Sequence, residues 1–576
     1  MKQLTGSQIV LECLKEQGVD TVFGYPGGAI LNIYDELYKQ QDCFTHILTG
    51  HEQGASHAAD GYARSTGKVG VCFATSGPGA TNIVTGIATA YMDSIPMVAI
   101  TCNVGVGLLG KDSFQEVDIT GITLPITKHN FIVKNVEDLA DTIRRAFRIA
   151  QSGRKGPVLI DIPKDVTAAV ANYKEQEPKE IKRKIDNIRE MDIRRAVELI
   201  ESSTKPFILV GGGAVLSDAS EELREFVEKV HAPVADTLMG KGAINSRHPL
   251  YLGNVGIHGG YAPNVAITDC DVMISIGTRF NDRITGKLST FAQNCKIVHI
   301  DVDAASISKN IKVDIPIVAD AKLAIEALLE YMEPHDLGEW PTQLQQLKVD
   351  HPITQADEDG LTPEAIIQYI NDHYERPIVT TDVGQNQLWT TQFLEIEGNH
   401  QLLTSGGLGT MGYGFPAAIG AKFGNPHTPV FAICGDGGVQ MNIQEFATAM
   451  HYHLPVTLVV INNGYLGNVR QWQQLFYDKR YACTNLLMDE SAIVTRDLID
   501  KGEFEYVPDF VKLAEAYGAQ GVRVTKAEEL RAAFAKADAF KKGPTLIECI
   551  IPTEVNVLPM VPAGKSLSDM LLKDKK

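Results

Sequence analysis

The sequence has 576 residues, of which 44% are apolar and 22% charged, and this length predicts two to four domains rather than one core. A formal net charge of −18 argues against broad binding to nucleic acid or to an anionic membrane surface. Nine cysteines without a CxxC pair are typical of reduced thiols, and no apolar run is long enough to cross a membrane. With no signal-peptide pattern, we expect a cytoplasmic protein.

The first region alternates short apolar strands with helical stretches. VGVCFATS (69–76) predicts a strand, GPGATN (77–82) opens a helix, and PMVAITC (96–102) predicts the next strand. This rhythm indicates a parallel sheet covered by helices on both faces, and PVLIDIP (157–163) is its expected last strand. We expect a first domain over 1–170. The polar stretch 172–187 that follows is interpreted as a solvated linker, since acidic residues interrupt its basic ones.

The same rhythm returns twice more. PFILVGGGAV (206–215), VMISIG (272–277) and KIVHIDVD (296–303) predict a middle domain over 188–345, with a second linker near 335–360. VFAICGDG (430–437) and PVTLVVINN (455–463) belong to a third domain over 360–576. The predicted fold class is therefore α/β, with three doubly wound parallel sheets.

One glycine motif favours a different function. GLGTMG (407–412) matches the dinucleotide-binding pattern, with a strand before it, a helix after it and Asp436 beyond. Alone it would suggest an NAD-dependent dehydrogenase. Against this, Asp436 lies between glycines, and its strand leads into a further helix and strand that end at Asn463.

Asp436 and Asn463 follow two successive predicted strands. The carboxyl ends of parallel strands meet at one edge of a sheet, where ligands of α/β proteins bind. Carboxylate and amide oxygens suit Mg²⁺, and the adjacent glycines let a diphosphate approach the backbone. The pattern predicts a diphosphate held through a divalent metal; a tight turn without a ligand is the alternative.

The spacing GDG–x(24)–NN resembles the signature of thiamine-diphosphate enzymes. This resemblance implies a third metal ligand, the backbone carbonyl of Tyr465. It also implies a glutamate beside the thiamine pyrimidine, and GHEQGASHAADGYAR (50–64) supplies Glu52 after a strand-like run. In that family the first domain of one chain and the third domain of another form each site, so a homodimer or dimer of dimers is implied.

Over nearly its whole length the chain resembles the large catalytic subunits of the acetohydroxyacid synthases, also called acetolactate synthases. The segments that carry the likeness include FGYPGGAILNIYDEL (23–37), GKDSFQEVDITGI (110–122), GTRFNDRITG (277–286), TSGGLGTMGYGFPAAIGA (404–421) and NVRQWQQLFY (468–477). The implied reaction joins pyruvate, after loss of CO₂, to a second 2-oxoacid. Pyruvate as acceptor gives 2-acetolactate and 2-oxobutyrate gives 2-aceto-2-hydroxybutyrate, at the start of branched-chain amino-acid synthesis.

The resemblance also implies site residues and cofactors, namely thiamine diphosphate, Mg²⁺ and FAD without net redox chemistry. For thiamine diphosphate it implies Glu52, Pro26, Gly27, Gln385, Met411, Gly437 and Gly438, with Asp436, Asn463 and Tyr465 on the metal. For FAD it implies Arg154, Gly211, Gly212, Gly213, His258, Gly277, Arg279, Asp301 and Asp320. For substrate it implies Arg283 on the acceptor carboxylate, Trp472 on its side chain, and Phe114, Gln115 and Lys164 around the reaction site.

Several positions depart from the family pattern and put the acceptor preference in doubt. The departures are Gly50, the segment 103–110, Lys241, Asn281, Asn386, Asn468 where a Met is usual, and an extra stretch at 486–506. Two other readings stay open: an FAD-independent catabolic acetolactate synthase, and a pyruvate-oxidase-like flavoprotein. A separate small regulatory subunit also stays open.

Overall fold

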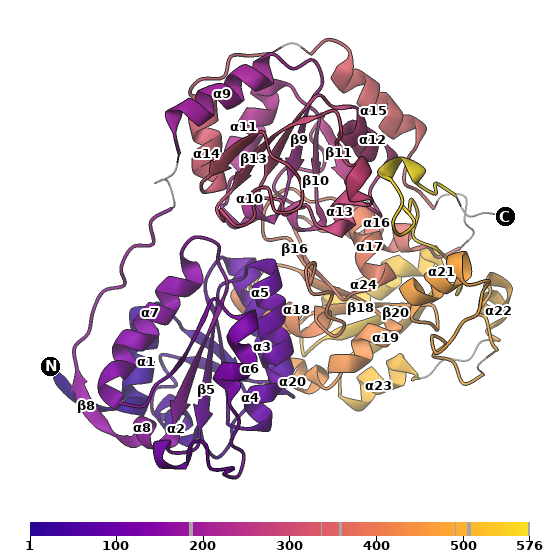
Figure 1. The fold of residues 1–576 in the computed structure, drawn as a ribbon. Helices are drawn as coiled ribbons and strands as arrows, with labels where there is room; N and C mark the ends of the chain where they lie inside the picture. The colour runs from indigo at the N-terminus through magenta and orange to yellow at the C-terminus, as the bar shows by residue number, and fades with distance from the viewer. Residues whose placement is uncertain (184–187, 336, 356–359, 490, 504–507, 574–576) are drawn as a thin grey trace.

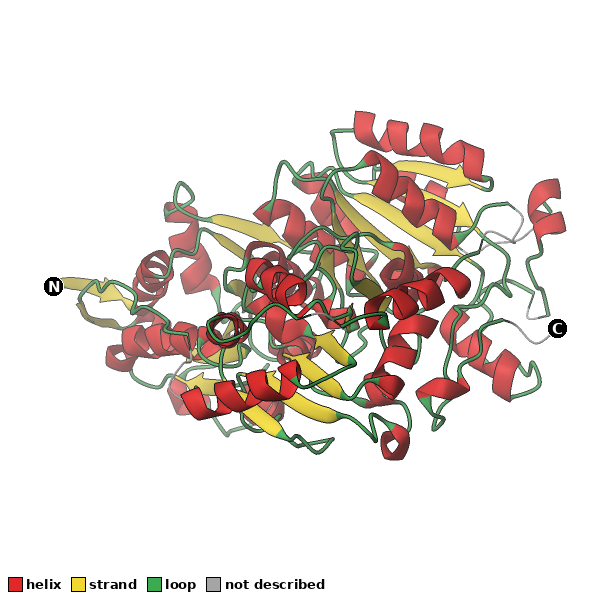
Figure 2. Ribbon diagram, turned by 90° about the horizontal axis from the view of Figure 1, so that it is seen from above, coloured by secondary structure: helices red, strands yellow, loops and turns green. Residues whose placement is uncertain are grey.

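The computed structural model describes residues 1–183, 188–335, 337–355, 360–489, 491–503 and 508–573. Three six-stranded sheets, each with all its strands parallel, form three domains that follow one another along the chain (Figure 1). Helices lie on both sides of the strands (Figure 2). The predicted class, α/β with three doubly wound parallel sheets, is confirmed. Within the described residues no helix is long and apolar enough to cross a membrane.

The first sheet has the strand order β3-β2-β4-β5-β7-β6. Its strands are β2 (Thr21–Gly24), β3 (Thr45–Leu48), β4 (Gly70–Ala74), β5 (Met97–Asn103), β6 (His129–Ile132) and β7 (Pro157–Pro163). Its helices are α1 (Gly6–Glu16), α2 (Leu31–Lys39), α3 (Glu52–Thr66), α4 (Pro78–Asn82), α5 (Val84–Asp93), α6 (Ile119–Thr123), α7 (Leu139–Gln151) and α8 (Lys164–Ala168). A separate antiparallel pair, β1 (Lys2–Thr5) and β8 (Val170–Tyr173), stands at the start of the first predicted linker.

The third sheet repeats this arrangement, with the order β16-β15-β17-β18-β20-β19. Its strands are β15 (Ile378–Thr381), β16 (Leu402–Leu403), β17 (Val430–Gly435), β18 (Thr457–Asn462), β19 (Gln520–Val524) and β20 (Thr545–Ile550). Its helices are α16 (Pro363–His373), α17 (Gln385–Phe393), α18 (Gly414–Gly424), α19 (Asp436–Val439), α20 (Glu445–His451), α21 (Gly467–Phe476), α22 (Arg496–Lys501), α23 (Phe510–Ala516) and α24 (Leu530–Ala539). Counted from its own first strand, each of these two sheets has the order 2-1-3-4-6-5.

The middle sheet differs, with the order β11-β10-β9-β12-β13-β14. Its strands are β9 (Pro206–Val210), β10 (Val234–Asp236), β11 (Tyr251–Asn254), β12 (Val272–Ile276), β13 (Lys296–Asp301) and β14 (Ile315–Val318). Its helices are α9 (Glu190–Glu201), α10 (Gly212–Leu216), α11 (Ser220–Val230), α12 (Tyr261–Asp269), α13 (Asp282–Thr285), α14 (Ala321–Leu329) and α15 (Trp340–Asp350). Counted likewise, this is 3-2-1-4-5-6, the order of dinucleotide-binding sheets, in which the ligand lies where the order reverses.

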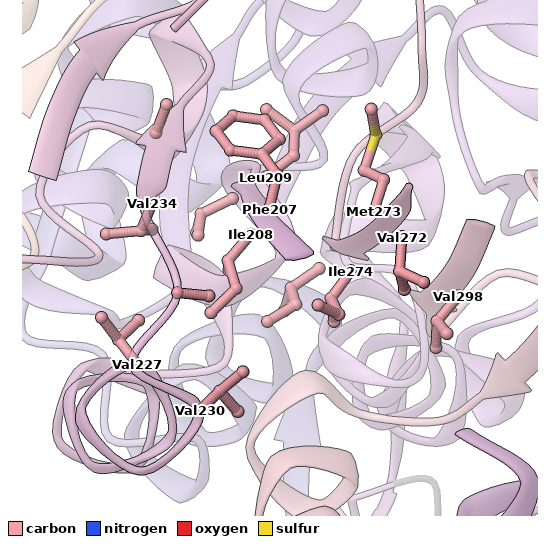
Figure 3. Close-up of a cluster of buried hydrophobic side chains, with 14 of the residues drawn as sticks. Phe207, Ile208, Leu209, Val227, Val230, Val234, Val272, Met273, Ile274 and Val298 are labelled. Atoms are coloured by element: carbon pink, nitrogen blue, oxygen red, sulfur yellow. The ribbon is translucent and has the colours of Figure 1, made fainter. Parts of the chain in front are cut away.

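The strands are continuously apolar because both faces of each sheet are covered. In the middle domain Phe207 and Leu209 of β9 lie beside Met273 of β12, with Val227 and Val230 of α11 below them (Figure 3). All five side chains are fully buried. This core fixes β9 and β12, whose carboxyl ends carry the glycines of the predicted FAD site.

The first and third domains pack through α3 and α18. A Cβ added at Gly61 would stand 2.2 Å from the carbonyl oxygen of Ala417, and one at Gly420 would stand 1.8 Å from that of Ala58. The two helices therefore cross at a distance that only glycine permits. This contact fixes the first and third domains relative to each other.

The second predicted linker, near 335–360, contains a helix. Residues 340–350 form α15, whose Trp340 and Leu344 are buried in the middle core, and Trp340 Nε1 donates to the carbonyl of Pro206. The prediction of a linker is wrong for these residues. Apolar side chains recur among the glutamines of this segment, and they pack against the middle core. The first linker runs along the outside of the molecule without helix or strand over 174–183 (Figure 1); residues 184–187 lie outside the described part.

The chain returns from the third sheet to the middle domain after β20. Ile257 accepts a backbone hydrogen bond from Val561 at 2.8 Å, and Lys565 accepts one from Lys287 at 2.9 Å. Leu567 is then buried in the middle core. This C-terminal strap, residues 557–571, ties the third domain to the middle one.

Candidate active site

Asp436 stands where β17 passes directly into α19. Its Oδ1 accepts from the amide of Gly437 at 3.0 Å, while Oδ2 is buried without a hydrogen-bond partner. Burial raises the pKa of Asp436 to about 7. A buried carboxylate with a free oxygen is destabilised unless a cation or donor meets it, so this position fits a metal ion.

Asn463 lies beside it because β17 and β18 pair in parallel, with Gly435 opposite Ile461. Its Nδ2 donates to Oε1 of Gln385 at 3.0 Å, and its Oδ1 accepts from the amide of Tyr465 at 3.1 Å. Gln385 is itself fixed through Nε2 by Gln471 and the carbonyl of Val555. These hydrogen bonds fix the orientation of the Asn463 side-chain amide. Its Oδ1 is therefore held in a defined position, as a metal ligand must be.

Glycines keep this site open. A Cβ on Gly437 would stand 2.6 Å from Leu466 and 3.7 Å from the terminal methyl of Met411, and one on Gly438 would overlap the Asp382 carboxyl group at 2.6 Å. Asp382 accepts from the amide of Gly412 at 2.9 Å, which anchors the loop that carries Met411. The predicted residues Asp436, Asn463, Tyr465, Gln385, Met411, Gly437 and Gly438 thus gather at the point where the third sheet's order reverses.

The candidate metal position has no cluster of charged ligands among the described residues. Over the described ranges, no group of three or more His, Cys, Asp or Glu could hold a metal ion. Asp436, Asn463 and the Tyr465 carbonyl form a mixed oxygen set, which suits Mg²⁺ with waters and phosphate oxygens. The helix α20 between the two strands is short, at Glu445–His451, and the helical conformation already begins at Asp436.

Glu52 is the first residue of α3, which follows the edge strand β3 of the first sheet. The side-chain amide of Asn82 donates to Oε2 of Glu52 at 2.9 Å. Oε1 of Glu52 lies 3.1 Å from the position that a Cβ at Gly79 would take. Glu52 is buried, and so one carboxylate oxygen is held while glycine keeps space beside the other. Gly27, after Pro26, is required because a Cβ there would stand 2.4 Å from Thr75.

The remaining first-domain residues lie around the same edge. Gln115 has a positive φ of 58° and packs on Gly77, since a Cβ there would stand 2.9 Å from its Cα. Phe114 is 87% exposed. Lys164 begins α8 directly after β7 and is also exposed. An aromatic ring and an ammonium group therefore project from this edge rather than into their own domain.

A cavity of about 610 Å³ extends from the middle sheet to the third domain. It begins where the middle sheet's order reverses, between the glycines that follow β9 and Gly277 after β12. Its lining includes Arg154, Gly212, Gly213, His258, Gly277, Arg279, Asp301, Asp320, Arg283, Trp472 and Asn468. Gly211 lies behind this lining, and a Cβ there would meet the carbonyl of Gly277 at 2.3 Å.

Charged groups of both signs line the cavity. Arg154 donates to Ser94 at 2.8 Å and to Asp303 at 3.4 Å, while Arg279 donates to the carbonyl of Met92. Burial raises the pKa of Asp301 to about 6. His258 keeps an unpartnered, buried Nδ1, and burial lowers its pKa to about 4. A cavity of this size, lined by glycines and by charged groups of both signs, fits an elongated dinucleotide.

The residues that depart from the family pattern have defined positions in the structure. Lys241 is buried at the cavity beside Asp236, and Asn386 donates to the carbonyl of Ile433 at 2.9 Å. Gly50 packs on Gln444, at 2.8 Å from an added Cβ, and Asn281 precedes α13 at the cavity. In the extra stretch 486–506, residue 490 and residues 504–506 lie outside the described part, whereas Tyr465 Oη donates to the carbonyl of Ala492 at 2.8 Å.

Two supporting residues were not singled out from the sequence. Asn82 holds Glu52, and Asp382 holds the loop of Met411. Asp382 carries a usable signal, since it directly follows the β15 strand at the reversal of sheet order. Asn82 carries none, because its partner lies 30 positions away on another helix.

Comparison with known proteins assigns a family to each of the three domains. Residues 4–122 match the thiamine pyrophosphate enzyme N-terminal TPP binding domain, 193–328 its central domain and 382–549 its C-terminal TPP binding domain. The chain is 44% identical to the acetolactate synthase large subunit of Cyanidium caldarium, covering 98% of this chain and 96% of that protein. It is 45% identical to that of Corynebacterium glutamicum, covering 99% and 90%, and 44% to a probable one of Methanocaldococcus jannaschii, covering 99% and 95%.

Proposed function

Since the chain belongs to the acetolactate synthase large subunits of the thiamine pyrophosphate enzyme family, we propose that it joins pyruvate, with loss of CO₂, to a second 2-oxoacid. Pyruvate as acceptor gives 2-acetolactate, and 2-oxobutyrate gives 2-aceto-2-hydroxybutyrate, the entry to branched-chain amino-acid synthesis. The unpartnered, buried oxygen of Asp436 beside Asn463 is the observation that carries this proposal, because it supports a metal–diphosphate site at this edge of the third sheet.

The third domain holds the diphosphate end of the cofactor. Asp436 Oδ2, Asn463 Oδ1 and the Tyr465 carbonyl are the three protein ligands of Mg²⁺. Gly437 and Gly438 let the phosphate oxygens reach backbone amides, and Met411 lies close to Gly437. When bound, thiamine diphosphate supplies the carbanion that adds to a 2-oxoacid carbonyl and accepts the electrons released with CO₂.

Glu52 exchanges a proton with the pyrimidine end of the cofactor. Its carboxylate is buried and held through Oε2 by Asn82, so Oε1 remains available to exchange a proton with a ring nitrogen of the cofactor. A fixed, partly desolvated carboxylate is an effective acid–base group. Pro26 and Gly27 close the same edge of the first sheet.

The acceptor is held at the third-domain end of the cavity. Arg283 is an exposed guanidinium on α13 at this cavity, and it pairs with the acceptor carboxylate through two N–H groups. Trp472 on α21 presents an aromatic surface to the acceptor side chain. Gln115, Phe114 and Lys164 come from the exposed edge of the first domain, on the side from which substrate enters.

FAD occupies the remainder of the cavity. The dinucleotide strand order of the middle sheet, its glycines at the reversal point and the size of the cavity support this assignment. Arg154, Arg279, Asp301 and Asp320 contribute charged groups along it. In this proposal FAD has no net redox role, which separates the chain from a pyruvate-oxidase-like flavoprotein.

The active assembly is a homodimer or a dimer of dimers, in which the first domain of one chain completes the third domain of another. The 87% exposure of Phe114 beside Gln115 supports this arrangement. Two inactive variants, Glu52→Gln and Asn463→Ala, test it when they are unfolded together and refolded as a mixture. A mixed dimer then has one intact site, so activity returns; a mixture that stays inactive contradicts the shared site. A separate small regulatory subunit is compatible with this assembly.

The function is tested with purified protein, thiamine diphosphate, Mg²⁺ and FAD, given equal amounts of pyruvate and 2-oxobutyrate. Formation of either acetohydroxy acid supports the carboligase, and loss of activity on removal of FAD excludes the FAD-independent catabolic enzyme. Acetate or acetyl phosphate in place of a ligation product, with reduction of an added dye, overturns the proposal in favour of the oxidase.

A further inference from the structure

One side-chain carboxamide in the cavity, that of Asn468, has a buried oxygen without a hydrogen-bond partner among the described residues. Asn468 lies one turn before Trp472 on α21, and both line the cavity together with Arg283. Residues four apart on a helix share a face, so the amide and the indole act on the same part of the cavity. The Oδ1 atom of Asn468 is buried and accepts no hydrogen bond.

The Oδ1 atom lacks a hydrogen-bond donor in the orientation of the amide that the structure records. A hydroxyl group can both donate and accept, so it satisfies either orientation. An apolar group of the same size leaves the buried atom unpaired, which is unfavourable.

We propose that Asn468 determines acceptor specificity, and that the enzyme takes 2-oxoacid acceptors with a hydroxyl group on C3. The smallest is 3-hydroxypyruvate, which has the shape of 2-oxobutyrate with OH in place of the terminal CH₃. This inference rests on the proposed carboligase function, with Arg283 on the acceptor carboxylate and Trp472 on its side chain. Asn468 then binds the C3 hydroxyl.

The reaction balances without an oxidant. The C1–C2 bond of pyruvate breaks and releases CO₂, and a bond forms between the former carbonyl carbon of pyruvate and C2 of 3-hydroxypyruvate. One proton goes to the oxygen on C2 of the acceptor. The product is 2-hydroxy-2-(hydroxymethyl)-3-oxobutanoate.

The test is a competition between the two isosteric acceptors on the fully loaded enzyme. Pyruvate labelled with ¹³C at C3 is the donor, so that only products containing the labelled acetyl group are counted and 3-hydroxypyruvate acting as donor is ignored. The ratio of hydroxymethyl to ethyl product gives the relative kcat/KM. We expect this ratio to fall by tenfold or more in Asn468→Met and in Asn468→Leu.

Val469→Met is the matched control. Val469 is the next residue of α21, is 41% exposed and is absent from the cavity lining, so methionine there should leave the ratio within twofold of the unmodified enzyme. Melting temperatures verify that all three variants are folded, and the two substitutions at Asn468 remove the same amide with different side chains.

The outcomes separate this inference from the function on which it rests. Acetolactate from pyruvate alone, measured in the unmodified enzyme, reports the carboligase independently. If acetolactate forms but the ratio is the same within twofold in both Asn468 variants, Asn468 does not select the acceptor. If no ligation product forms from any acceptor, the proposed function itself is wrong.

Discussion

Nε2 of His400 lies 3.0 Å from a carboxylate oxygen of Asp218. The other ring nitrogen, Nδ1, faces the backbone carbonyl of Arg64. Both partners are acceptors, so only the doubly protonated imidazolium donates to both. The three residues come from the third, middle and first domains, and this contact therefore joins all three.

This joint predicts a pH-dependent stability. Hydrogen bonding to Asp218 raises the pKa of His400 above its ordinary 6.5, and His400 lowers the pKa of Asp218. The His400 contribution is therefore complete below pH 6.5 and is lost as pH rises through its folded pKa; the Asp218 contribution is lost only in strong acid. Because Asp218 is half exposed, we expect less than about 1 kcal/mol. Thermal melting of His400→Gln should show a deficit at pH 5.5 that shrinks by pH 8.5. An equal deficit at both pH values contradicts this prediction.

Removal of Asp93 should be far more costly. Its carboxylate is 2.9 Å from Arg64 Nη2 and accepts from the amides of Gly406 and Gly407 across the domain contact. Asp93→Ala leaves the buried Arg64 guanidinium with Asp60 and the carbonyl of Thr404, and we expect a loss of about 3–5 kcal/mol. Glu190→Ala, which breaks an exposed pair with Arg194, is the control and should leave the free energy of unfolding nearly unchanged. Chemical denaturation measures the free energy of unfolding of both variants. Similar losses would contradict the prediction that the buried ion pair contributes more than the exposed one.

Alanine substitutions at the adjacent residues Asn462 and Asn463 should have different effects. Asn463 faces the metal site, whereas Asn462 Nδ2 donates to Glu548 at 2.9 Å inside the third core. We expect Asn463→Ala to weaken Mg²⁺-dependent binding of thiamine diphosphate by roughly 100-fold, which corresponds to about 2.7 kcal/mol. Asn462→Ala should lower the melting temperature with binding within about tenfold of normal. Titration calorimetry on the folded variants measures both affinities. A larger loss of binding in Asn462→Ala than in Asn463→Ala would contradict the assignment of Asn463 as the metal ligand.

Glu52→Gln should separate catalysis from binding. The glutamine oxygen can still accept from Asn82, so the edge of the first sheet stays in place, but proton exchange with the cofactor is lost. We expect kcat to fall by about 10²–10⁴-fold while thiamine diphosphate binds within a few-fold of normal. Steady-state kinetics and calorimetry on one preparation give both values. A fall in binding as large as the fall in kcat would show that Glu52 serves only to hold the cofactor.

The sequence was sufficient for the fold class and for the pattern of donors at the third sheet. Asp436 and Asn463 were predictable because each directly follows an apolar strand, and parallel pairing then places them side by side. The first and third regions were also recognisable as similar in rhythm. Their identical strand order needed the structure, since β6, β14 and β19 are short and only partly buried and give weak strand signals.

Contacts between distant residues could not be predicted in this way. The contact of His400 with Asp218 spans 182 positions, and the hydrogen bond between Thr89 and Thr410 spans 321. Neither residue type carries a local pattern that points to its partner. The unpartnered atoms of Asp436 and Asn468 belong to the same class, because only the surrounding side chains show that a donor or cation is missing.

The strap that buries Leu567 in the middle core has a consequence for synthesis on the ribosome. The strands of that sheet are complete at Val318, yet the core receives Val561 and Leu567 only near the end of translation. At ~5–20 residues per second this delay is roughly 10–50 s. Until then the middle domain presents an uncovered apolar surface, which we expect to attract chaperones and to leave this domain sensitive to protease.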